Sequence, residues 1–249
     1  MNKNFKVRFS VSILLLIIAA VFLFTFNSIP FKIFFGTFAF VASLELFSFF
    51  SNFRTKSAKP AKRNNLPLCI IFSLIEIACL ITSTIFIAKQ DALTIVVIIL
   101  GVCGYDVFAY LFGSWLGGKI FKKSRPFPFV SKNKTWEGTI LGLLTALILV
   151  VLTSFFACIT GPGDTNEYHL CHTTILWLCP LLALIGDLFE SLLKRFFNIK
   201  DSNENVIKYP LFTKLELLVG GSEGHGGYLD RIDSLAFTAT MLLLLSCIL

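Results

Sequence analysis

Acidic and basic side chains gather between residues 184 and 234 in an arrangement that could bind a metal ion and a phosphate. Carboxylates are costly to bury in an apolar helix. Their clustering with lysine and arginine therefore favours a divalent metal ion and a phosphate over simple packing. The residues that share one helical face, at steps of three, four and seven, are Asp187, Glu190, Ser191 and Lys194.

Part of this cluster has the chemistry of a magnesium and phosphate site. Mg²⁺ is usually held by one or two carboxylates together with substrate phosphates and water. Asp187 and Glu190 can supply such oxygen ligands. Lys194 and Arg195 can hold phosphate oxygens. The alternative interpretation is an internal salt-bridge network of a transporter.

A second polar group closes the same stretch. The two glycines in it allow a ligand to approach the backbone closely. The two aspartates are three residues apart, so both carboxylates can face one region if a helix begins there. The group consists of His225, Gly226, Gly227, Asp230, Arg231 and Asp233.

Two upstream segments carry further candidates. The first places Asp106, Tyr110, Gly113 and Gly117 on one helical face, where close helix packing is the alternative role for the glycines. The second segment precedes a helix, and lysines beside the free N–H groups of a helix start make a good anion site. A solvated basic loop is the alternative. This second segment contains Ser131, Lys132, Lys134, Thr135, Glu137 and Gly138.

Composition indicates which elements must position these residues. The chain has 249 residues, of which 55% are hydrophobic and 15% charged, so it is more apolar than soluble domains. Apolar runs of about 20 residues, the length that crosses a bilayer as a helix, recur along it. We predict an all-α polytopic membrane protein with about seven transmembrane helices, at 10–29, 31–53, 66–88, 92–116, 139–159, 173–193 and 235–249. The first reads as an uncleaved signal anchor, and the last is short.

The positive charges indicate the orientation of the chain. With the N-terminus inside, 20 of the 22 lysines and arginines fall in inside segments, and only Lys32 and Lys89 fall elsewhere. The outside loop 161–172 carries Asp164 and Glu167 but no lysine or arginine. This positive-inside pattern predicts a cytoplasmic N-terminus and puts 184–234 on the cytoplasmic face, at the plasma membrane if the source is bacterial.

These motifs, in this order, resemble the phosphatidate cytidylyltransferases, also called CDP-diacylglycerol synthases. The family pattern is Ser, two residues, Lys-Arg, four residues and Lys-Asp, then a spacer, His-Gly-Gly, two residues, Asp-Arg, one residue and Asp. The segments around Asp106 and 131–138 are similar to the family as well, so the resemblance covers about half the chain. The matching positions of the pattern are Ser191, Lys194, Arg195, Lys200, Asp201, His225, Gly226, Gly227, Asp230, Arg231 and Asp233.

One departure concerns the spacer before His-Gly-Gly, which is short in the family. Here 23 residues separate Asp201 from His225, and Glu223-Gly224 stand where the family usually has Pro-Gly. The insertion, roughly 203–222, could lie on the membrane surface as an amphipathic segment. It leaves open the geometry of His225, a changed lipid substrate and reduced activity.

The resemblance implies an enzyme that transfers a cytidylyl group from CTP to phosphatidate, giving CDP-diacylglycerol and pyrophosphate. The chain would divide into N-terminal transmembrane helices at 1–100 and a catalytic membrane region at 101–249. Mg²⁺ is the expected cofactor. A second cation and a homodimer are left open, and we expect no nucleic-acid partner. The alternatives are an enzyme that uses a polyprenyl or other lipid phosphate, and a transporter.

The resemblance also implies a role for each matching residue. The expected metal ligands are Asp187, Asp230, Glu190 and Asp233. The expected catalytic set is Asp187, Asp230, Lys194, Arg195, His225 and Arg231. Substrate binding is expected of Asp106, Ser131, Lys132, Lys134, Thr135, Glu137, Ser191, Lys200, Asp201, Gly226 and Gly227.

Overall fold

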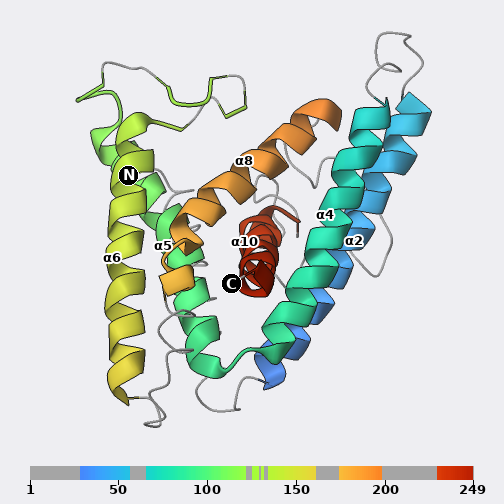
Figure 1. Ribbon diagram of the computed structural model, residues 1–249. Helices are drawn as coiled ribbons and strands as arrows, with labels where there is room; N and C mark the ends of the chain where they lie inside the picture. The colour runs from blue at the N-terminus through green and yellow to red at the C-terminus, as the bar shows by residue number, and fades with distance from the viewer. Residues whose placement is uncertain are drawn as a thin grey trace.

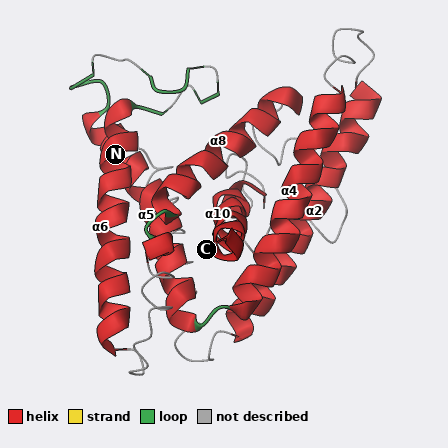
Figure 2. Cartoon of the chain, viewed as in Figure 1, coloured by secondary structure: helices red, strands yellow, loops and turns green. Residues whose placement is uncertain are grey.

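The computed structural model is all-helical over the residues that it describes, as the sequence predicts (Figures 1 and 2). These residues are 29–56, 66–121, 125–128, 130–131, 134–160, 174–197 and 229–248, and for some of them only the backbone is described. No strand occurs among them. The helices are α2 (Ile29–Lys56), α4 (Leu66–Lys89), α5 (Ala92–Leu116), α6 (Trp136–Thr160), α8 (Cys179–Phe197) and α10 (Leu229–Ile248).

Three of these helices are long and apolar enough to cross a membrane. They are Ile70–Lys89, Ala92–Leu116 and Trp136–Phe156, and they coincide with three predicted spans. Shorter apolar helical stretches occur at Lys32–Leu44 in α2 and at Ile232–Ile248 in α10. The predicted span 10–29 lies almost wholly outside the described residues. The total of seven spans therefore stays a prediction.

The sixth predicted span, 173–193, differs from the helix that forms there. α8 begins at Cys179 and continues to Phe197. Pro180 lies in its first turn, where the missing N–H breaks no intrahelical hydrogen bond. Because α8 carries Asp187, Glu190, Lys194 and Arg195, it is not among the helices apolar enough to count as spans.

Glycines set the distance between α5 and α6, which run antiparallel. A Cβ atom on Gly142 would lie 2.8 Å from the Cα atom of Ala109, and one on Gly138 would lie 2.5 Å from the Ala109 carbonyl oxygen. The same Cβ atom on Gly138 would lie 2.9 Å from the Cα atom of Gly113 in α5. Small residues one turn apart let two membrane helices approach closely. For Gly113 the packing interpretation is therefore confirmed.

α10 lies among α4, α8, α2 and α5 (Figure 1). Small side chains face these neighbours, because Ala236 and Ala239 are fully buried. The hydroxyls of Thr240 and Thr82 are 2.8 Å apart, which links α10 to α4. Gly186 brings α8 against α10, since a Cβ atom there would lie 2.9 Å from Cβ of Phe237.

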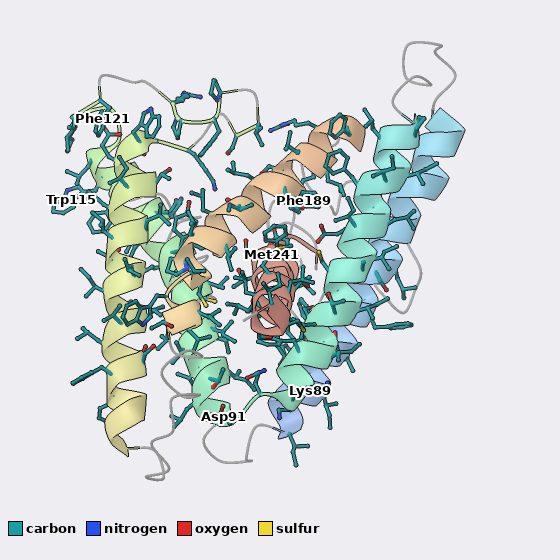
Figure 3. All side chains as sticks on the ribbon, in the orientation of Figure 1. Lys89, Asp91, Trp115, Phe121, Phe189 and Met241 are labelled. Carbon is teal, nitrogen blue, oxygen red and sulfur yellow. The ribbon has the colours of Figure 1, made fainter. Side chains whose placement is uncertain are left out.

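An aromatic cluster fixes α8 across α4 and α10. The ring centroid of Phe72 in α4 lies 5.3 Å from that of Phe189 and 5.0 Å from that of Phe196, both in α8. Phe189 is in turn 5.9 Å from Phe237 of α10, and Figure 3 shows it close to this helix. Aromatic pairs of this kind contribute about 0.5–1.5 kcal/mol each beyond their buried area. The cluster therefore holds the helix that carries Asp187 and Glu190.

The two ends of the bundle differ in their side chains. Trp115 and Phe121 lie at one end, and Lys89 and Asp91 lie at the other (Figure 3). Asp91 caps α5 by accepting hydrogen bonds from the N–H groups of Leu93 and Thr94, at 3.0 and 3.1 Å. The turn between α4 and α5 is thus closed by a local cap.

We expect Gly142→Ala to destabilise the bundle by about 1–3 kcal/mol, because the added methyl group would overlap backbone atoms of Ala109. Denaturant unfolding in detergent measures this loss. Gly104→Ala is the matched control at the same helix contact. Its added Cβ atom would lie 3.6 Å from Leu149, an ordinary contact. Equal losses in the two variants would contradict this account of the packing.

Candidate active site

The centre of the candidate site is an ion pair between Lys134 and Asp187. The Nζ atom of Lys134, in the loop before α6, contacts the Oδ2 atom of Asp187 in α8. The two side chains are 17% and 31% exposed, so the pair is largely shielded from water. Such a contact is stronger than one on an open surface, because the effective dielectric constant is lower. It joins two motifs that are distant in the sequence.

Two further carboxylates lie within electrostatic range of this pair. Asp106 of α5 interacts with Asp187 and with Lys134, and also with Asp233 of α10. Asp106 is accessible to solvent, whereas Asp233 is buried. A charged side chain thus comes from each of four segments: α5, α8, the loop before α6 and the second turn of α10. Among these described side chains, Lys134 interacts with both Asp106 and Asp187.

A second ion pair lies on α8. The Nζ atom of Lys194 is 2.7 Å from the Oε2 atom of Glu190, one turn earlier. Glu190 is only 1% exposed. The predicted common face of this helix therefore brings two of its charged residues into contact. Ser191, on the same helix, is half-buried.

α10 begins at Leu229, which meets the condition for its two aspartates to face one region. Asp230 and Asp233 both lie in the first two turns, three residues apart. The helix N-terminus also favours negative charge there. The side chains of Asp230 and Arg231 lie outside the described residues, so their contacts stay predictions.

Thr135 and Glu137 shape the loop around the start of α6. The N–H of Gly138 donates to Oγ1 of Thr135 at 3.2 Å, an N-terminal cap. The Oε1 atom of buried Glu137 accepts hydrogen bonds from three backbone N–H groups of the segment after α5. These groups belong to Gly118 at 3.0 Å, Ile120 at 3.1 Å and Phe121 at 2.9 Å. Glu137 therefore fixes this loop whether or not it also binds substrate.

The end of α8 is tied to the loop that carries Ser131. The Nε atom of Arg195 donates to the carbonyl oxygen of Val130 at 3.3 Å. Ser131 is half-buried, and its N–H donates to the carbonyl oxygen of Phe127 at 2.9 Å. Other predicted residues lie outside the described part of the chain, and their roles stay predictions: Lys132, Lys200, Asp201, His225, Gly226 and Gly227.

The described residues fit a divalent cation in chemistry but do not form a finished metal site. Carboxylate oxygens are the ligands that Mg²⁺ prefers, and several converge here. Within the described ranges, however, no three His, Cys, Asp or Glu side chains are arranged to hold a metal ion. The Lys134 ammonium contacts an oxygen of Asp187 that a metal ion would use.

Two residues at this site were not selected from the sequence as site residues. Tyr105 lies beneath Lys134, with the Nζ atom 5.6 Å from the centre of its ring. Glu76 is buried in α4 within electrostatic range of Asp233. The sequence signal for Glu76 was an acidic residue inside an apolar span. Tyr105 offered only its position beside Asp106.

Comparison with known proteins identifies the family of this chain. Residues 3–207 match the family model described as the cytidylyltransferase family. The chain belongs to this family. The match ends inside the insertion, before His225. The resemblance that the motifs predict is thus confirmed at the level of the family.

Several curated relatives carry the name phosphatidate cytidylyltransferase. The one from Rickettsia conorii is 32% identical over 178 residues, which is 71% of this chain and 68% of the relative. The one from Rickettsia felis is 38% identical over 134 residues, 53% of this chain and 51% of the relative. The one from Haemophilus influenzae is 36% identical over 123 residues, 49% of this chain and 36% of the relative. The matched region thus spans between 36% and 68% of the length of these relatives.

We expect Glu137→Ala to speed amide hydrogen exchange at Gly118, Ile120 and Phe121, because their shared acceptor is lost. Hydrogen-exchange mass spectrometry of the protein in detergent measures this change. Ser114→Ala removes a nearby hydroxyl that bonds only within α5, to the carbonyl oxygen of Leu111, and serves as the control. Unchanged exchange in Glu137→Ala would mean that the carboxylate does not order the loop.

Proposed function

We propose that this protein transfers a cytidylyl group from CTP to phosphatidate, giving CDP-diacylglycerol and pyrophosphate. The observation that carries the proposal is the ion pair between Lys134 and Asp187, with Asp106 and Asp233 in electrostatic range. It brings together segments whose motifs resemble one enzyme family. The relatives named phosphatidate cytidylyltransferase support the same reaction.

The residues of the site suit this chemistry. A phosphate oxygen of the lipid forms a bond to the α-phosphorus of CTP, and the bond from that phosphorus to the β-phosphate oxygen breaks. Both reactants are anions, so their repulsion must be offset by positive charge. We propose that Lys134, Lys194 and Arg195 supply it, and that phosphate oxygens compete with the groups that these side chains now contact. The attacking oxygen is already ionised near neutral pH, so positioning and charge neutralisation can suffice without a strong general base.

The proposed metal ligands are Asp187 and Asp230, with Asp106, Glu190 and Asp233 close by. A bound Mg²⁺ would supply further positive charge for the phosphates and orient them. Lys134 pairs with Asp187 in this structure, and we propose that it pairs with a phosphate oxygen when substrate is bound. We propose that phosphate binding is completed by Arg231, His225, Lys200 and the two glycines that follow His225.

We also propose that the protein is multi-pass, with about seven spans, and that its N-terminus and active site face the cytoplasm. The observations in support are its apolar helices and the distribution of its basic residues. The loop after α5 carries Lys119 and Arg125 and follows the end marked by Trp115. Aromatic and basic residues of this kind occur at membrane–water interfaces and on the cytoplasmic side, respectively. An active site at the cytoplasmic surface of the membrane would let a soluble nucleotide meet a lipid headgroup.

Release of pyrophosphate from CTP by the purified protein in detergent tests the reaction. We expect release only when both phosphatidate and Mg²⁺ are present. We expect Asp187→Asn to abolish this release, because the substitution removes the negative charge of a proposed metal ligand. Thin-layer analysis of the products, with a polyprenyl phosphate as competing acceptor, identifies the lipid substrate.

Asp91→Asn is the matched control, because it makes the same change at the opposite end of the bundle, and asparagine caps helices as well as aspartate does. It should retain full turnover. Near-normal turnover of folded Asp187→Asn would refute the metal assignment. No release by the folded wild-type protein with either lipid would refute the proposed reaction.

A further inference from the structure

Tyr105 lies at the junction between the apolar core and the candidate site. It belongs to α5, is 1% exposed and packs in the same core cluster as Val102 and Leu184. The next residue, Asp106, is accessible to solvent. The Nζ atom of Lys134 lies 5.6 Å from the centre of the Tyr105 ring. The core side chain is therefore also a direct neighbour of a charged group in the site.

The ring contact stabilises a partly desolvated cation. Lys134 is only 17% exposed, so its ammonium group has lost much of its water. The face of an aromatic ring attracts a cation within about 6 Å, and the attraction grows when the cation is desolvated. The tyrosine hydroxyl lies near Thr139 but makes no hydrogen bond among the described residues. The ring, rather than the hydroxyl, therefore makes the contact with Lys134.

We propose that Tyr105 is a positioning residue that holds the Lys134 ammonium group in place to bind a phosphate of the nucleotide. This inference rests on the proposed function. Among the described residues, Lys134 also contacts Asp187, which is a proposed metal ligand. A carboxylate shared with a metal ion holds a lysine less firmly, whereas an aromatic ring is not a ligand for Mg²⁺. The ring contact therefore persists in the loaded site.

The simpler interpretation is that Tyr105 only fills the core. A large buried ring stabilises the fold by its packing alone. In that case, the loss on its replacement would be the same whether or not Lys134 is present. A double-mutant cycle separates the two interpretations, because it isolates the energy that the two side chains share.

The cycle combines Tyr105→Leu, which removes the ring, with Lys134→Met, which removes the charge. We expect Tyr105→Leu to lower kcat/KM for CTP about tenfold, the size expected for a desolvated cation–π contact. Tyr105→Phe, which keeps the ring, should recover most of this loss. In the Lys134→Met background, Tyr105→Leu should change kcat/KM by less than about twofold, because its target is gone.

The same cycle is also read in the unfolding equilibrium of the ligand-free protein, which needs no turnover. In this measurement, the factor by which Tyr105→Leu raises the equilibrium constant for unfolding should be several-fold smaller in the Lys134→Met background than in the wild type. Equal losses in both backgrounds, or no recovery by Tyr105→Phe, would overturn the proposal. If Tyr105→Leu does not fold, Tyr105→Met takes its place. A wild type that releases no pyrophosphate would refute the proposed function while leaving this coupling measurable.

Discussion

The site depends on one electrostatic constraint: several carboxylates lie within range of one lysine, and the pair of that lysine with Asp187 is largely shielded from water. Lys134 contacts Asp187 and lies in electrostatic range of Asp106, which also interacts with Asp233. In surroundings of low dielectric constant, carboxylates that lie close together are costly unless a cation is shared between them. We therefore propose that this site binds further positive charge, which a divalent metal ion could supply in phosphate chemistry.

Close helix packing makes this convergence possible. Gly138 and Gly142 bring α6 against Ala109 of α5, so the loop with Lys134 lies beside Asp106. Gly186 brings α8 against α10 in the turn that contains Asp187. In a membrane, small residues rather than the hydrophobic effect set such contacts. The glycines next to the charged motifs thus determine whether those motifs meet.

Periodicity and local motifs could be predicted from the sequence, but contacts between distant segments could not. The helical face of Asp187, Glu190 and Lys194 follows from spacing alone. The start of α10 at Leu229 does not follow from it, because the predicted span begins at residue 235. The contact of Lys134 with Asp187 requires the register of α6 against α5, which no local pattern carries. Similarly, Glu137 belongs to a motif for which we predict substrate binding. Its carboxylate accepts hydrogen bonds from three backbone N–H groups of the segment that follows α5. Tyr105 reads as an ordinary core aromatic until Lys134 is placed over it.

The most direct test of this account is an experimental structure with a non-hydrolysable CTP analogue and Mg²⁺ bound. The account predicts that the phosphates lie between Lys134 and α8, with the Lys134 ammonium group turned from Asp187 to a phosphate oxygen and still over the Tyr105 ring. A nucleotide bound elsewhere, with the contact between Lys134 and Asp187 unchanged, would contradict it.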